Sequence, residues 1–62
     1  MNRITRVINR EGTETGEVIG SRRCRMSGCR ADCLCVKWPD GKRTWPCMRG
    51  MQQINETTMQ IQ

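Results

Sequence analysis

The amino-acid sequence predicts a small all-β fold made of short antiparallel strands. Glycine recurs at intervals of 4 to 13 residues between Gly12 and Gly50, and frequent turn-forming residues are typical of short strands joined by turns. No uninterrupted stretch shows the apolar i, i+3, i+4 spacing of an amphipathic helix with capping residues. With 62 residues, the chain is long enough for one small domain, whose stability is marginal unless something cross-links it.

The first half of the chain is divided by its glycines into short segments. We expect a strand near residues 3–8 and then a loop over residues 11–16, EGTETG. Two further strands are expected near residues 17–20 and 22–27. A turn around residues 28–32, GCRAD, should lead into the second half.

The second half is predicted to hold a hairpin with strands near residues 33–38 and 42–48. A short last strand around residues 52–55 would complete a single domain over residues 1–55. Residues 56–62 are polar and include two glutamines. We therefore expect them to form a frayed C-terminal tail.

The turn of this hairpin can be predicted from three residues. Pro39 has the fixed φ that the first position of a type I turn requires, Asp40 follows it, and Gly41 can adopt the left-handed position of a bulge. A three-residue loop results. A two-residue Asp-Gly loop is the alternative, and it would shift the strand register by one residue.

The three-residue loop predicts which residues face each other. Its register pairs Trp38 with Lys42, Cys35 with Trp45, and Cys33 with Cys47. Side chains alternate along a strand, so one face of the hairpin should carry Cys33, Cys35, Lys37, Arg43, Trp45 and Cys47. The other face, which is predicted to be core, should carry Leu34, Val36, Trp38, Thr44 and Met48.

The segment Val36-Lys-Trp38-Pro-Asp-Gly41, followed by Thr44, resembles the central hairpin of Src-homology-3-like small barrels, and the Tudor and KOW types are the most similar. The resemblance covers residues 17–55. It implies a closed barrel of about five short antiparallel strands that works as an interaction module. Tudor domains hold methylated side chains in aromatic cages, and KOW modules bind RNA or other proteins.

The basic residues point to an acidic partner. The chain has a net charge of +5, and the positive excess is concentrated in residues 21–50. Arginine forks suit phosphates, and an aromatic ring among cations can stack a base of a single-stranded nucleic acid. The candidate nucleic-acid-binding residues are Arg22, Arg23, Arg25, Arg30, Lys37, Lys42, Arg43 and Trp45. The alternatives are a protein-interaction adaptor without catalytic activity, using the same face on an acidic protein, and a merely solvated surface.

Five cysteines and no histidine leave three options for the sulfur chemistry. The favoured one is reduced, partly buried thiols with no bound cofactor. The second is an all-thiolate zinc site formed by Cys33, Cys35 and Cys47 with Cys24 or Cys29. The third is a disulfide such as Cys33–Cys47. The odd number of cysteines argues against a secreted fold held together by disulfides alone.

Several classes of function are not favoured by the sequence. There is no histidine to act as an imidazole base, the six acidic residues are scattered, and no activating partner for a catalytic cysteine is evident. We therefore expect no enzyme and no small-molecule substrate. No segment approaches the ~18 apolar residues of a membrane span, and the start of the chain lacks the apolar region of a secretory signal. A cytoplasmic location and no membrane partner are expected.

Overall fold

The structure is a computed structural model that describes residues 3–25, 27–28 and 30–62. The strands formed by these residues are β1 (Arg6–Ile8), β2 (Thr15–Arg23), β3 (Asp32–Lys37), β4 (Arg43–Thr44), β5 (Met51–Gln53) and β6 (Thr58–Ile61). A short 3-10 turn, η1 (Met48–Gly50), precedes β5, and no α-helix occurs among the described residues. The prediction of an all-β chain is confirmed.

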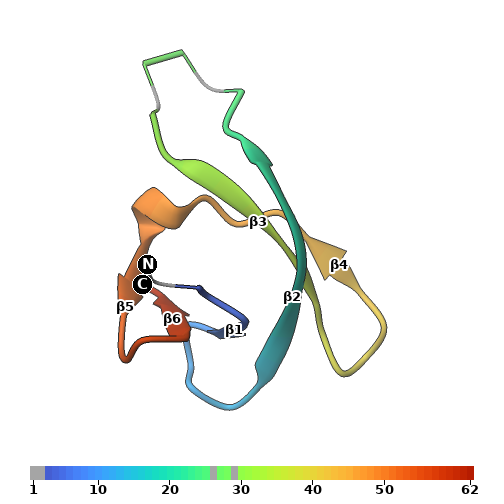
Figure 1. Ribbon diagram of the computed structural model, residues 1–62. Helices are drawn as coiled ribbons and strands as arrows, with labels where there is room; N and C mark the ends of the chain where they lie inside the picture. Colours follow the sequence, from blue (N-terminus) through green and yellow to red (C-terminus); the bar gives the residue numbers. More distant parts are fainter. Residues whose placement is uncertain (1–2, 26, 29) are drawn as a thin grey trace.

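The strands form one mixed sheet in the order β4-β3-β2-β1-β6-β5 (Figure 1). β1 and β6 are parallel, while all the other neighbours are antiparallel. β4 and β5 lie at opposite edges, so the sheet is open. The expected closed barrel of about five antiparallel strands is therefore wrong in closure, strand number and strand direction. The physical reason is that β6 lies between β1 and β5, which leaves β5 at an edge away from β4.

β2 is one long strand where the sequence predicted two. Val18 pairs with Val36 and Gly20 pairs with Cys35, so Ile19 is an extra residue that has no partner in this register. This bulge lets the strand continue through Gly20 instead of ending there. Ile19 is 47% exposed as a result. The strand ends at Arg23, earlier than the predicted residue 27.

The predicted register of the 33–47 hairpin is confirmed. Its β-ladder pairs Val36 with Thr44 and Lys37 with Arg43. At the turn, the Trp38 amide donates to the Lys42 carbonyl at 2.9 Å. Gly41 has a φ of 88°, the left-handed conformation that this three-residue loop requires.

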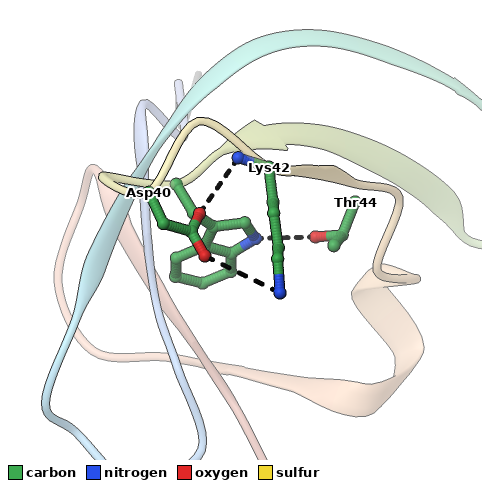
Figure 2. A network of polar contacts seen from close by, with 4 residues as sticks. Asp40, Lys42 and Thr44 are labelled. Carbon is green, nitrogen blue, oxygen red and sulfur yellow. Dashed lines mark hydrogen bonds and ion pairs between the residues drawn. The ribbon is translucent and has the colours of Figure 1, made fainter.

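The turn is stabilised by one side chain at its tip. The backbone amide of Lys42 donates to Oδ1 of Asp40 at 3.0 Å, and the Lys42 ammonium lies 4.0 Å from Oδ2 (Figure 2). Such an exposed ion pair adds little stability. The hydrogen bond to the backbone is the more important contact, because it satisfies an amide that the turn leaves without a strand partner.

The returning strand is shorter than the predicted 42–48. β4 ends at Thr44, and Pro46 has no amide hydrogen to donate to a ladder. The Pro46 carbonyl still accepts from the Leu34 amide at 3.0 Å, and an isolated antiparallel bridge pairs Cys33 with Cys47. The register of the hairpin thus continues past the end of the regular strand.

The expectation of a frayed tail over residues 56–62 is also wrong, because Thr58–Ile61 forms β6 and pairs with β1 inside the sheet. Asn55 makes the preceding turn, since its Oδ1 accepts from the Thr57 amide at 2.9 Å. Met59 is buried opposite Val7. The mostly polar composition of residues 56–62 led to the prediction of a tail, whereas these residues include a strand that places Met59 in the core.

The core lies on one face of β3 and is covered by β1, β5 and β6. Its buried members are Val7, Leu34, Val36, Trp38, Met51 and Met59. Trp38 is only 9% exposed, and its indole Nε1–H donates to Oγ1 of Thr44 at 2.8 Å (Figure 2). This bond satisfies the only polar atom of a side chain that is otherwise apolar.

Candidate functional site

The face of β3 that points away from the core carries Cys33, Cys35 and Lys37. In the register, Cys33 lies between Arg22 on β2 and Cys47 on the returning chain. Lys37 lies beside Arg43 of β4. We call the surface that carries Arg22, Lys37, Arg43 and Trp45 the basic face. It is the surface that the hairpin was predicted to expose.

Three cysteines converge next to the basic face. The sulfur atoms of Cys24, Cys33 and Cys47 all lie within 4.8 Å of one another. Cys24 follows the end of β2, Cys33 is in β3, and Cys47 directly precedes η1. Cys33 is buried and the other two are half-buried. The sheet thus gathers thiols from three separate segments; we call them the thiol cluster.

Backbone hydrogen bonding explains why these thiols meet. The bond from Leu34 to Pro46 makes those two residues a hydrogen-bonded pair, so the neighbouring Cys33 and Cys47 form a non-hydrogen-bonded pair. Opposed residues of this kind have Cα atoms about 4.5 Å apart, closer than in hydrogen-bonded pairs. On the other side, the Cys24 amide donates to the Ala31 carbonyl at 3.3 Å. This bond extends the β2–β3 pairing far enough to bring Cys24 beside Cys33.

The thiol cluster differs from the predicted ligand set in one cysteine. Cys33, Cys47 and Cys24 belong to it, whereas Cys35 does not. Cys35 is buried opposite Gly20, two residues further along β3 than Cys33. This separation along the strand keeps its sulfur atom away from the sulfur atoms of the thiol cluster. Cys29 lies outside the described residues. None of the cysteines that the structure describes is joined in a disulfide.

The surroundings of Cys33 in the thiol cluster disfavour its deprotonated, thiolate form. Burial, followed by the hydrogen bond and charge interaction with Cys24, raises the pKa of Cys33 above its ordinary value. The hydrogen bond with Cys47 and the positive charge of Arg22 act in the opposite direction on the same pKa. Cys33 is therefore a neutral thiol near pH 7 unless a cation joins the cluster.

A cation–π contact lies beside the thiol cluster. The guanidinium of Arg22 sits over the ring of Trp45, 4.1 Å from its centroid. The two residues come from β2 and from the chain after β4, on opposite sides of β3. Trp45 remains 41% exposed, so part of the indole is accessible from solvent. An exposed contact of this kind contributes roughly 0.5–1 kcal/mol.

The predicted nucleic-acid-binding residues are divided among several places. Arg22, Lys37, Arg43 and Trp45 share the basic face. Arg23 pairs with Asp32 and, by strand alternation, points to the opposite side from Arg22. Lys42 lies at the hairpin tip beside Asp40. Arg25 and Arg30 are exposed in the connection between β2 and β3.

No carboxylate among the described residues forms an ion pair with a cation of the basic face. In the described part of the chain, the only ion pair within 4.0 Å joins Lys42 and Asp40. Glu17 is the register partner of Lys37, yet it forms no ion pair with it. Arg22, Lys37 and Arg43 therefore leave an uncompensated positive charge on this surface.

Sequence reasoning named Arg22 and Trp45 separately and missed their contact. The alternation of side chains along β2 is the sequence feature that could have predicted this contact. Arg22 and Cys24 are two residues apart and so lie on one face. Once Arg22 is placed opposite Cys33, both the cation–π contact and the membership of Cys24 in the thiol cluster follow.

No family model, curated protein or solved structure matches this chain. The described residues include no helix of the length and apolar character needed to cross a bilayer.

Proposed function

We propose that this chain is a small nucleic-acid-binding module that holds RNA or single-stranded DNA through phosphates and stacks one base on Trp45. The observation that carries the proposal is the half-exposed Trp45 ring with the Arg22 guanidinium over it. An exposed aromatic among uncompensated cations is the arrangement that binds single strands without sequence preference.

Arg22 has two roles in this proposal. In the unbound protein its guanidinium covers the Trp45 ring, and the flat cation keeps that ring from packing elsewhere. On binding, a base takes the place over the ring and the guanidinium turns to the adjacent phosphate, which its fork can hold with two hydrogen bonds. The Arg22 guanidinium, which covers the stacking site in the unbound protein, thus contacts the nucleic-acid backbone in the complex.

The phosphate contacts are supplied by the remaining cations of the basic face. Lys37 and Arg43 are neighbours across β3 and β4, and Arg25 and Arg30 are further exposed cations in the connection between β2 and β3. With about four phosphates neutralised, the logarithm of the binding constant should fall with the logarithm of salt concentration with a slope near −3.

Trp45 gives the decisive experiment. Trp45→Ala should weaken binding to a mixed-sequence single strand by roughly 1–3 kcal/mol, the usual contribution of one stacked base, with the salt slope unchanged. Trp45→Phe keeps an aromatic face and should retain most of the affinity. Equal affinity of the wild type and Trp45→Ala, or no binding at physiological salt, would contradict the proposal.

A protein-interaction adaptor is the second candidate, and the open sheet favours it. β4 and β5 are edge strands, and an exposed edge can accept a strand from a partner. A Tudor-like aromatic cage is less well supported, because Trp38 belongs to the core and only Trp45 is exposed. Recovery of one defined protein at physiological salt, without oligonucleotide binding, would favour the adaptor.

A further inference from the structure

We propose that Cys24, Cys33 and Cys47 bind one zinc ion through three thiolates, with a water molecule as the fourth ligand. The observation that carries this proposal is the mutual approach of the three sulfur atoms within 4.8 Å. The three cysteines come from the end of β2, from β3 and from the segment before η1, so the fold itself brings them together. Soft thiolate ligands select zinc over hard ions such as magnesium and calcium.

The spacing of the sulfur atoms is close to that of a zinc site. With Zn–S bonds of about 2.3 Å in a tetrahedron, neighbouring sulfur atoms are about 3.8 Å apart. The sulfur atoms of the thiol cluster lie within 4.8 Å of one another, so no pair has to approach by more than about 1 Å. Small rotations of the side chains provide such a movement, and the backbone pairing of Cys33 with Cys47 needs no change.

Backbone hydrogen bonds hold the ligands in place on both sides of β3. The Pro46 carbonyl accepts from the Leu34 amide at 3.0 Å, and this bond keeps the two adjacent cysteines opposite each other. On the other side of β3, the Cys24 amide donates to the Ala31 carbonyl at 3.3 Å. Zinc would therefore bind to segments that the sheet already positions. It would in turn link β2, β3 and the segment before η1, the kind of cross-link that a domain of this size usually needs.

The charge beside the thiol cluster fits a divalent ion held by three thiolates. Binding releases three thiol protons, and a zinc ion with three thiolates and a water molecule carries a net charge of −1. Arg22 is the register partner of Cys33 on β2. The single positive charge of this neighbour offsets the single negative charge of the site.

The burial of the three cysteines leaves room for a ligand from solvent. Cys33 is buried, whereas Cys24 and Cys47 are only half-buried, so an ion between the three sulfur atoms would lie near the surface. The half-buried side gives the ion a path of entry and gives water access to its fourth position. Three protein ligands and one water molecule are a common form of zinc coordination.

The experiment measures metal binding by the full chain, purified under reducing conditions. Native mass spectrometry should find one zinc per chain, and cadmium substitution followed by cadmium NMR should give the shift of a three-sulfur site, below that of a four-sulfur site. Cys24→Ala, Cys33→Ala and Cys47→Ala should each lose stoichiometric zinc. Cys35→Ala is the matched control: it removes another buried cysteine of β3, and it should keep the zinc and the cadmium shift.

A further variant, Cys29→Ala, tests whether the three thiolates are sufficient, because Cys29 has no part in the proposed site. This variant should bind one zinc and keep the wild-type cadmium shift. Three results would overturn the proposal: a reduced, folded wild-type chain that takes up no zinc at equimolar metal, a four-sulfur cadmium shift, or loss of zinc in a folded Cys29→Ala or Cys35→Ala chain. Because the cadmium shift of the wild type reports the number of sulfur ligands directly, the proposal can be tested even if an alanine variant does not fold.

Discussion

Arg22 and Trp45 are in contact across the full width of β3, with the guanidinium 4.1 Å from the centre of the indole ring. The contact depends on two registers, that of β2 with β3 and that of β3 with the returning chain. It also joins the two features on which the proposed nucleic-acid binding rests, a delocalised cation and an exposed aromatic surface. Its neighbour in sequence, Arg23, lies on the other side of the sheet.

This difference between adjacent arginines gives the first prediction. Arg22→Ala should make the salt dependence of oligonucleotide binding shallower by about 0.7 in slope, the contribution of one phosphate contact on a single strand. Arg23→Ala removes the same charge from the opposite side and should leave the slope nearly unchanged. Titrations at several salt concentrations, followed by Trp45 fluorescence, measure both. Equal slopes for the two variants would place the nucleic acid on another surface.

Gly16 should tolerate no side chain. A Cβ atom there would overlap Cγ1 of Val36 and press on the ring of Trp38. Overpacking of a filled core costs typically 1–3 kcal/mol, so Gly16→Ala should lower the free energy of unfolding by about that amount in urea denaturation. Gly50→Ala is the control, because nothing lies within 4 Å of a Cβ at that position. A Gly16→Ala variant as stable as Gly50→Ala would show that the core is loosely packed there.

The C-terminal strand should contribute to stability as a core element does. Met59 is 6% exposed and packs within the core, and truncation of a buried methionine costs roughly 2–5 kcal/mol. Met59→Ala should therefore strongly destabilise or unfold the chain in a thermal melt. Ile54→Ala removes an apolar side chain that is 50% exposed, and it should change stability by at most about 0.5 kcal/mol. A benign Met59→Ala would mean that residues 58–61 are frayed after all.

Metal-free protein should lose stability as the pH rises through the alkaline range. The pKa of Cys33 is higher in the fold than its ordinary value of 9.0, first through burial and then through Cys24, against the opposing effects of Cys47 and Arg22. The unfolded chain therefore releases this proton at a lower pH than the folded one does. Stability is fully present below the unfolded pKa and declines as the pH rises through the folded one.

Urea denaturation in chelator and reductant, from pH 7 upward, tests this pH dependence. Cys33→Ala removes the titrating thiol and should show a smaller alkaline loss than the wild type. An identical alkaline decline in both proteins would assign the effect to other groups. Zinc should reverse the trend at the acidic end, because its thiolate ligands compete with protons and metal binding weakens as the pH falls.

Local chemistry was sufficient to predict the hairpin over residues 33–47. Pro39, Asp40 and Gly41 specify the turn, and the turn specifies every pairing up to Cys33 with Cys47. These are contacts between residues close in the chain, where backbone preferences of single residues decide the geometry. The alternation of side chains then separates the Trp38 face, which is core, from the face of Trp45.

Tertiary structure alone decided the rest. Residues 56–62 are polar at five of seven positions, and the pairing of residues 58–61 with β1, some fifty residues earlier in the chain, is parallel and long-range. The same holds for the thiols. The alternation of side chains places Cys33, Cys35 and Cys47 on one face. The register of β2 against β3 adds Cys24 to the thiol cluster and leaves Cys35 opposite a glycine, outside it. Pairings between distant segments are selected by the burial of the whole core, and that is a property of the assembled sheet.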